Sequence, residues 1–172
     1  GGQLLAAFFQ SATARTAGFN TVDIGQMVPA SLLFMMMLMF IGAGATSTGG
    51  GIKVTTFAVV LLATRAFLTK RPHVTAFGRT LSPQIVTRSL AIIIVSTMVL
   101  MLAMFLLMLT ESRPFDKIMF ETVSAFATVG LSTGITASLS EPGKLILVLV
   151  MICGRLGPLT LAFMLARPSE TR

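Results

Sequence analysis

A six-residue pattern, T-x-G-x-x-T, occurs twice in this chain, at residues 16–21 and at residues 128–133. The two copies, called the first and second hexads, lie 112 positions apart, and the same offset aligns residues 8–42 with residues 120–154 without a gap. A chance match of six residues would not stay in register over such a stretch. The chain therefore contains two copies of one unit, in which a short helix precedes the hexad and a long apolar helix follows it.

Each hexad combines a glycine with two threonines, a pattern that suits the coordination of a dehydrated cation. A short extended segment can line a pore with its carbonyls where a glycine adopts dihedral angles that a Cβ disfavours, and threonine hydroxyls add oxygen ligands at the rim. The alternative interpretation is a pair of similar re-entrant turns with a structural purpose only. The predicted ion-binding residues are Thr16, Ala17, Gly18, Phe19, Asn20, Thr21, Thr128, Val129, Gly130, Leu131, Ser132 and Thr133.

Apolar residues make up 54% of the chain and charged residues only 11%, whereas soluble domains carry about 25% charged residues. Residues 89–109 form a run of 21 without a formal charge, and a helix needs about 20 residues to cross the hydrocarbon core. Residues 145–166 are similar apart from Arg155. We therefore predict an all-α, multi-pass integral membrane protein.

The charged residues indicate topology. The net charge is +7, but the basic residues lie between apolar segments and are not interleaved with aromatic residues, so nucleic-acid binding is not expected. By the positive-inside rule, one connection that is basic and contains no acidic residue lies in the cytoplasm. Its basic residues are Arg65, Lys70, Arg71, Arg79 and Arg88. The single Cys153 excludes a disulfide framework and a thiol metal cluster, and the single His73 lies in the same cytoplasmic connection.

Residues 26–68 form an apolar stretch of 43 residues, too long for one straight crossing, and a glycine-rich segment at residues 42–51 interrupts it. Two complete helices would turn the second hexad toward the opposite side of the membrane, so the hexads could not meet. One crossing with an irregular loop at membrane depth keeps both hexads on the same side. Such backbone persists only where protein buries it or water hydrates it, so we expect the loop to line the pore.

Changes in composition divide the chain into four predicted segments. These are a short helix, the first hexad and the interrupted crossing (1–68), a basic cytoplasmic linker (69–87), a complete last unit (88–166) and a cytoplasmic tail (167–172). The first unit lacks a leading span, so the chain holds one and a half units and we expect it to be a fragment. A closed ring of carbonyls needs about four such loops, so two must come from an absent N-terminal half or from other subunits.

In the last unit we expect a leading span and then a short helix from Asp116 to about residue 127. Asp116 suits the positive end of the helix dipole, and the negative carbonyl end then points towards the second hexad, as expected beside a cation pathway. The final helix, residues 142–166, contains Gly154, Gly157 and Pro158. These residues should bend or break it midway.

Two basic residues lie within apolar segments, where an ionisable group costs about 2.5 to 3.5 kcal/mol on insertion scales. We predict that Lys53 and the polar loop before it form an intramembrane gate; the alternative is that the Lys53 side chain extends to the cytoplasmic interface. Arg155 either binds this loop below the second hexad or pairs with carbonyls freed at Pro158. Arg15, whose counterpart is Ala127, is expected to be structural. The predicted gate residues are Gly42, Gly44, Thr46, Ser47, Thr48, Gly49, Gly50, Gly51, Lys53 and Arg155.

The sequence offers no candidate residues for catalysis, because it contains no paired carboxylates, no Ser/His/Asp set and no nucleotide-binding loop. The twelve methionines are not accompanied by Cys or His at ligand spacing, so we expect them to pack or to face lipid. A transport protein is therefore expected, and not an enzyme, with no organic cofactor bound by this chain.

Four stretches resemble the Trk/Ktr/HKT family of potassium-uptake proteins, most of all the membrane subunit of bacterial Ktr-type systems. They are TARTAGFNT (13–21), STGGGIKVTTFAV (47–59), SAFATVGLSTGIT (124–136) and GRLGPLTLA (154–162). They are similar to the family's third filter, its intramembrane loop, its fourth filter and its broken last helix. The resemblance spans nearly the whole chain.

The resemblance implies a pseudo-fourfold, potassium-channel-like fold of four repeated units, of which this chain covers most of the third and all of the fourth. It implies that Gly18 and Gly130 are filter glycines, that residues 42–53 form the gate and that Arg155 lies near the pore. Potassium is the implied ion, with a sodium requirement left open, and the implied location is a bacterial inner membrane. Family members form homodimers and bind a cytosolic nucleotide-responsive ring, for which residues 69–88 are the expected contact.

Two other functions compete with passive, gated potassium uptake. A non-conducting membrane scaffold would place its glycines at helical spacing on one face for close packing, whereas here they cluster in loops. A secondary transporter with broken helices would show inverted repeats, whereas these two copies run in the same direction. We therefore expect ion uptake through carbonyl sites of the two hexads, with the scaffold as the alternative.

Overall fold

The computed structural model describes residues 2–15, 17–42, 44, 49–71, 73–76 and 78–157. Its α-helices are α1 (Gly2–Thr13), α2 (Pro29–Phe40), α3 (Val54–Leu68), α4 (Pro83–Thr110), α5 (Phe115–Phe126) and α6 (Glu141–Leu156). Short 3-10 helices, η1 (Ile24–Gln26) and η2 (Thr136–Ser138), follow the two hexads, and strands β1 (Thr75–Ala76) and β2 (Arg79–Thr80) pair antiparallel. The prediction of an all-α chain is therefore correct apart from this small hairpin.

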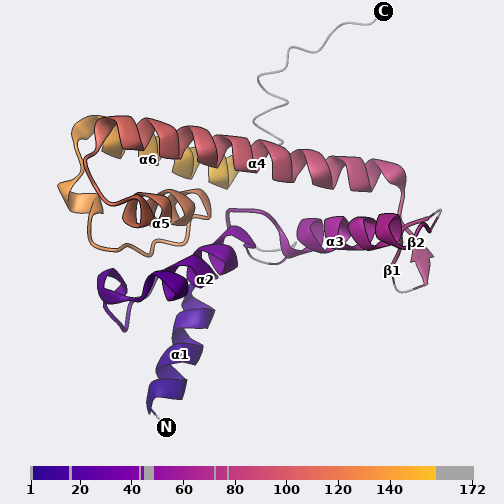
Figure 1. The fold of residues 1–172 in the computed structure, drawn as a ribbon, viewed down its shortest axis with the longest axis horizontal. Coiled ribbons are helices and arrows are strands. Elements are labelled where there is room, and N and C mark those ends of the chain that lie inside the picture. The colour runs from indigo at the N-terminus through magenta and orange to yellow at the C-terminus, as the bar shows by residue number, and fades with distance from the viewer. Residues whose placement is uncertain are drawn as a thin grey trace, which may run out of the picture.

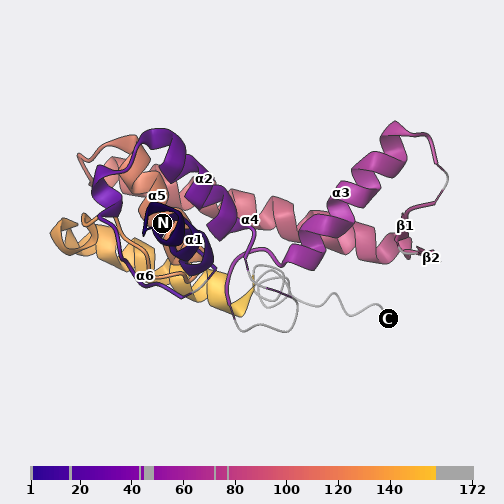
Figure 2. The same ribbon diagram turned by 90° about the horizontal axis from the view of Figure 1, so that it is seen from below.

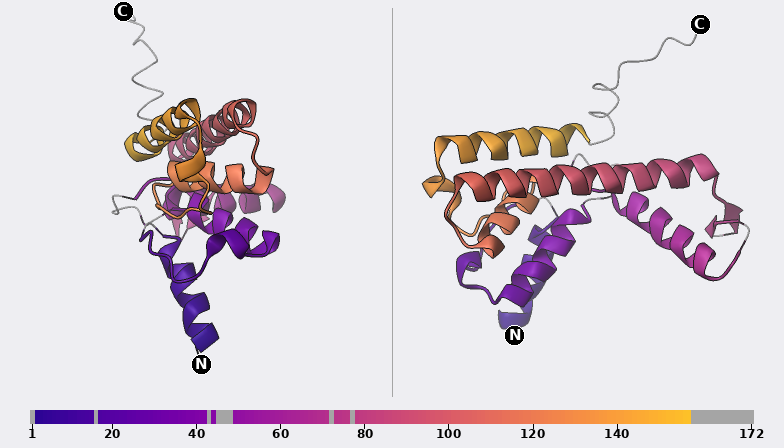
Figure 3. Two further views of the ribbon diagram at one scale, coloured as in Figure 1. Left: turned by 90° about the vertical axis from the view of Figure 1, so that its left-hand side faces the viewer. Right: turned by 45° about the horizontal axis from the view of Figure 1, so that its top comes forward.

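Helix α4 runs along the length of the molecule and organises the other elements (Figure 1). Helices α5 and α6 pack against one half of α4, and α3 packs against the other half next to the hairpin. Helix α2 packs against α5. The turned views show the same grouping, with α1, α2, α5 and α6 gathered at one end and α3, β1 and β2 at the other (Figures 2 and 3).

In the described part of the chain, α4 is the helix that is long and apolar enough to cross a membrane. It begins at Pro83, five residues before Arg88, so the helix includes the last part of the segment predicted as the linker. Proline suits the first turn of a helix, because the N–H that it lacks would have no partner there. Helices α2 and α3 have 12 and 15 residues, so each is too short to cross alone.

The expected interruption of the apolar stretch at residues 26–68 is present between α2 and α3. Helix α2 ends at Phe40, and the N–H of Ile52 donates to the Phe40 carbonyl at 3.2 Å. The N–H of Gly42 donates to the Ile52 carbonyl at 2.8 Å, which closes the base of the glycine loop, defined as residues 42–53. Helices α2 and α3 follow one another along α4 with an angle between them (Figure 3). The backbone polar groups at the loop base are thus satisfied by other backbone groups, as an interrupted crossing requires.

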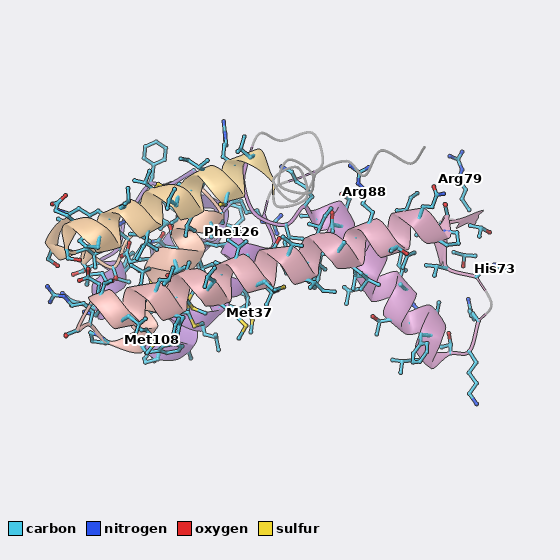
Figure 4. All side chains as sticks on the ribbon, turned by 90° about the horizontal axis from the view of Figure 1, so that it is seen from above. Met37, His73, Arg79, Arg88, Met108 and Phe126 are labelled. Carbon is cyan, nitrogen blue, oxygen red and sulfur yellow. The ribbon has the colours of Figure 1, made fainter. Side chains whose placement is uncertain are left out.

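The apolar core lies where α2, α4, α5 and α6 meet. Its most deeply buried side chains include Met39, Leu107, Phe120 and Phe126, and all residues from 120 to 127 are buried. Phe126 lies between α4 and α6, whereas His73 and Arg79 lie at the opposite end of the molecule, with Arg88 farther in along α4 (Figure 4). The second hexad therefore follows a helix that is fixed on all sides by packing. Helix α4 also exposes large apolar side chains suited to lipid, namely Met98, Met101, Leu102 and Phe105.

The hairpin and the end of α6 differ from the sequence-based expectations. Gly78 has φ +77° and supplies the turn that pairs Ala76 with Arg79. Strands of two residues carry no alternation of apolar and polar positions, so the pattern gave no signal for them. Helix α6 ends at Leu156 and Gly157 has φ +84°, whereas Gly154 lies inside regular α6. Residues 158–172, with Pro158 and the expected tail, lie outside the described residues.

Candidate functional site

The two hexads lie against one another although they are 112 positions apart in sequence. A Cβ added to Gly130 would lie 3.8 Å from the Cα of Gly18, and a Cβ added to Gly18 would lie 2.5 Å from the carbonyl oxygen of Val129. Gly18 has φ +72° and Gly130 has φ +89°. Both glycines thus adopt the left-handed conformation that the hexad pattern predicts, which side chains with a Cβ disfavour. Thr16 lies outside the described residues.

A hydroxyl from the preceding short helix holds each hexad at the same position. In the first copy, Thr13 Oγ1 donates to the Phe19 carbonyl at 2.9 Å and accepts from the Phe19 N–H at 2.9 Å. In the second copy, Ser124 Oγ donates to the Leu131 carbonyl at 2.6 Å. Phe19 and Leu131 are equivalent under the repeat, so both copies fix the residue directly after the hexad glycine. The two hydroxyls come from neighbouring, non-equivalent positions, which is why sequence alignment of the copies does not reveal this contact.

The second hexad has a further anchor, Glu121, that the sequence analysis missed. Glu121 lies in α5 and is 5% exposed. Its carboxyl group accepts from Ser132 Oγ at 2.7 Å, from the Thr133 N–H at 2.8 Å and from Thr133 Oγ1 at 2.9 Å. The available signal was an ionisable residue on the short helix directly before the hexad, because an ionisable group beside an expected ion pathway is a candidate functional residue.

The end of α5 leads directly into the second hexad. The N–H of Thr128 donates to the Ala125 carbonyl at 3.1 Å, and the N–H of Val129 donates to the Ser124 carbonyl at 3.0 Å. Thr128 has φ +52°, an uncommon value for a residue with a branched side chain. Asp116 lies in the first turn of α5, as predicted. The other, C-terminal end of α5 is the negative end of the helix dipole, and it is directed at the turn that begins the second hexad.

Gly50 and Gly51 of the glycine loop pack against the end of α5. The N–H of Gly50 donates to Thr128 Oγ1 at 3.0 Å, and a Cβ added to Gly50 would lie 3.0 Å from the carbonyl oxygens of Phe126 and Ala127. Lys53 Nζ donates to the Gly49 carbonyl at 2.6 Å, so its ammonium group is directed back to the loop. The predicted gate residues Thr46, Ser47 and Thr48 lie outside the described residues, whereas Gly42, Gly44, Gly49, Gly50, Gly51 and Lys53 are described.

Arg155 and Arg15 lie at the margins of this arrangement, and both side chains are exposed. Arg155 is in the last turn of α6, directly after Gly154. A Cβ added to Gly154 would overlap the carbonyl of Phe126, so α6 approaches the end of α5 at this point. Arg155 therefore lies one residue along α6 from this contact.

Two cavities adjoin the hexad-bearing helices. A cavity of about 310 Å³ lies beside the second hexad and is lined by Glu121, Thr128, Gly130, Leu131, Ser132 and Thr136, among others. A cavity of about 480 Å³ lies between α1 and α2 and is lined by Gln10 with mostly apolar residues. Gln10 is 6% exposed, and neither of its amide atoms has a hydrogen-bond partner in the described part of the chain. Under the repeat, α1 of the first copy corresponds to α5 of the second copy. Helix α4 packs on α5, whereas α1 borders the larger of these two cavities.

The whole chain matches a known family. Residues 1–171 match the family model TrkH, described as a cation transport protein. The chain belongs to the TrkH family. It is 66% identical to the Ktr system potassium uptake protein B of Vibrio alginolyticus over 99% of its length, and 43% identical to the protein of the same name from Bacillus subtilis over 98%. It is 39% identical to the potassium/sodium uptake protein NtpJ of Enterococcus hirae over 95%.

The TrkH-family match also covers the fold. The crystal structure of the potassium transporter TrkH from Vibrio parahaemolyticus aligns with 97% of this chain at a TM-score of 0.77 and 24% identity. The chain spans 38% of that structure and 38% of each of the two Ktr system proteins. Proteins of the TrkH family are transporters and not enzymes. The mostly helical structure with its long apolar helix α4 agrees with a membrane transporter.

Proposed function

We propose that this chain forms part of a gated potassium-uptake pathway in which the two hexads supply two loops of a carbonyl-lined selectivity filter. The contact between Gly18 and Gly130, both at positive φ, carries this proposal. It brings two loops with the same T-x-G-x-x-T pattern to one point, as a ring of carbonyl ligands around an ion requires. Each loop follows a short helix whose C-terminal, negative end favours a cation.

Potassium is proposed as the ion because two of the matched relatives are named potassium uptake proteins. Another relative is named a potassium/sodium uptake protein, so sodium is included as a proposed second ion. Transport is passive and follows the electrochemical gradient of the ion. The carbonyls replace the hydration shell on entry, and repulsion between ions in adjacent sites drives exit.

The glycine loop is the proposed gate. It lies at the end of α5, and Lys53 adds a positive charge to a segment that packs directly against the first residue of the second hexad. A cationic group near the pathway opposes the passage of a cation while the loop stays in this position. Arg155, one residue from the contact between α6 and α5, is proposed to contribute to the same barrier.

The remaining loops of the filter are proposed to come from the part of the full-length protein outside this chain. Buried Gln10, with its unpaired amide beside a cavity, supports a further polar partner on the α1 side. The complete protein is proposed to be a multi-pass protein of the bacterial inner membrane, in contact with lipid, and to form a homodimer. The pseudo-fourfold arrangement of four units belongs to the same proposal.

A cytosolic nucleotide-binding ring is the proposed regulatory partner of the basic linker. Arg65, Arg71 and His73 line a cavity of about 140 Å³ between the end of α3 and the hairpin. No acidic residue occurs between Asp23 and Glu111, so this end of the molecule is uniformly basic. An acidic surface on a cytosolic partner would complement it.

Rubidium uptake by the full-length parent protein in liposomes tests the proposal. A potassium gradient that makes the interior negative should drive rubidium inward, and external sodium should compete less well than external potassium. Absence of rubidium flux under any gradient would contradict a pore and favour the scaffold function, in which close glycine packing such as that of Gly154 on Phe126 serves assembly alone.

A further inference from the structure

We propose that Glu121 is a positioning residue that sets ion discrimination by fixing the shape of the second hexad. This role rests on the proposed filter function of the hexads. Glu121 is 5% exposed and belongs to α5, in which residues 120–126 are all buried. It lies outside the hexad itself, and nothing in the T-x-G-x-x-T pattern includes it.

The Glu121 carboxyl group joins the hexad to the element that follows it. Oε1 receives three bonds, from Ser132 Oγ, the Thr133 N–H and Thr133 Oγ1, at 2.7, 2.8 and 2.9 Å. Oε2 receives one bond, from Thr136 Oγ1 in η2, at 2.6 Å. The N–H of Gly134 extends the network by donating to Ser132 Oγ at 2.9 Å. An ionised carboxyl group only accepts hydrogen bonds, and here it meets a set of groups that donate to it.

The first copy has a different set of residues at the equivalent positions. The counterparts of Glu121, Ser132, Thr133 and Thr136 are Phe9, Asn20, Thr21 and Ile24. Phe9 and Ile24 have no polar side-chain atoms, and Thr21 is exposed whereas Thr133 is buried. The first hexad therefore has no carboxyl group at the position equivalent to Glu121. The two hexads share a backbone conformation at their glycines but differ in how firmly the second half of each loop is held.

The second hexad borders open space beside Glu121. A cavity of about 310 Å³ adjoins Glu121 and is lined by Gly130, Leu131 and Ser132, among others. Leu131 and Thr133 are buried, and the bonds to Glu121 add a second restraint on the part of the loop that faces this space. Hydrogen bonds to an ionised group are roughly twice as strong as bonds between neutral groups.

This restraint bears on selectivity whichever account of carbonyl filters holds. If selectivity comes from cavity size, an anchored loop prevents the ring from contracting around a smaller cation. If it comes from the number and field strength of carbonyl dipoles, the anchor fixes how many of them face the ion. In both cases a loosened second hexad admits sodium more readily relative to rubidium or potassium.

The test uses the full-length parent protein in liposomes and measures the ratio of rubidium to sodium uptake. Glu121→Gln keeps the size of the side chain but removes its charge, and Thr136→Val removes the one donor to Oε2. Glu111→Gln is the matched control, because Glu111 Oε1 also accepts from a backbone N–H, that of Ser140 at 2.9 Å, and from a Ser140 hydroxyl, in an outer connection away from the hexads. Unfolding midpoints of all variants are measured in detergent.

The expected result is a fall of about tenfold in the uptake ratio for Glu121→Gln and about threefold for Thr136→Val, with no change for Glu111→Gln. Wild-type ratios in both test variants would overturn the role of Glu121 while leaving the pore intact. If Glu121→Gln fails to fold, Thr136→Val decides by the same criterion. An equal fall in Glu111→Gln would also overturn the proposal, because it would show that the ratio reports lost stability. Absence of flux in wild type would instead overturn the filter function itself.

Discussion

The backbone N–H of Gly50 donates a hydrogen bond of 3.0 Å to Thr128 Oγ1, across 78 positions of sequence. This bond joins the glycine loop to the first residue of the second hexad. Thr128 is held at φ +52° by the end of α5 and cannot relax freely when the loop moves. The proposed gate and the proposed filter therefore share one hydroxyl group, so a change in either should be felt by the other.

Replacing Gly50 should displace the glycine loop from the end of α5. A Cβ at this position would lie 2.8 Å from Thr128 Oγ1 and 3.0 Å from the Ala127 carbonyl oxygen, so Gly50→Ala requires a shift of backbone. Loss of the bond to Thr128 is worth about 1 kcal/mol, which changes the occupancy of the closed loop about fivefold. We expect a several-fold rise in rubidium flux through the full-length protein. Gly44→Ala is the control within the same loop, because a Cβ there meets no described residue within 4 Å; equal flux in both variants would contradict the contact.

Replacing Lys53 should also loosen the loop, through a different bond. Lys53→Met retains the length of the side chain but removes the donor that bonds the Gly49 carbonyl at 2.6 Å. It also removes a positive charge near the pathway, so flux should rise at least as much as in Gly50→Ala. The comparison with Lys53→Arg, which keeps the charge, separates the two causes in flux measurements. Unchanged flux in Lys53→Met would remove Lys53 from the gate.

The two hexad glycines should differ in their tolerance of a Cβ. At Gly18 an alanine is strained by φ +72° and also meets the Val129 carbonyl oxygen at 2.5 Å, whereas at Gly130 the Cβ meets only the Cα of Gly18 at 3.8 Å. Backbone strain in the left-handed region costs about 1 to 2 kcal/mol in both cases. Gly18→Ala should therefore lower the unfolding midpoint more than Gly130→Ala. The opposite order in thermal unfolding would contradict the observed contact between the hexads.

Gly154 should be required for the close approach of α6 to α5. A Cβ there would overlap the carbonyl of Phe126, which is buried and cannot move aside, whereas a Cβ at Gly143 would overlap only the flexible side chain of Glu111. We expect Gly154→Ala to destabilise the full-length protein by about 1 to 3 kcal/mol, the range for overpacked cores, and Gly143→Ala by less. Unfolding in detergent measures the difference.

Much of the fold was predictable because it depends on the length and periodicity of apolar runs. The interruption between α2 and α3, the short helix α5 and the positive φ of the hexad glycines follow from glycine and charge placement along the chain. The start of α4 at Pro83 was not predicted, since a proline between polar residues has the same local signature in a linker and in a first helical turn.

Glu121 could not be assigned from the sequence, because its role depends on where the chain returns. Its donors lie at residues 132–136, and only the turn after α5 brings them back to the middle of that helix. The same holds for Thr13 and Ser124, which contact equivalent carbonyls from non-equivalent positions. A repeat in sequence predicts shared backbone geometry, whereas the side chains that support it are specific to each copy.

The most direct test of whether the facing hexads select the ion compares Gly130→Ser with Gly78→Ala in rubidium and sodium uptake by the full-length protein. Both glycines have positive φ, +89° and +77°, so both substitutions strain the backbone, but Gly130 contacts the other hexad whereas Gly78 lies in the hairpin. We predict that Gly130→Ser lowers the ratio of rubidium to sodium uptake while Gly78→Ala leaves it unchanged. Wild-type discrimination in Gly130→Ser would contradict the assignment of the hexads as a filter.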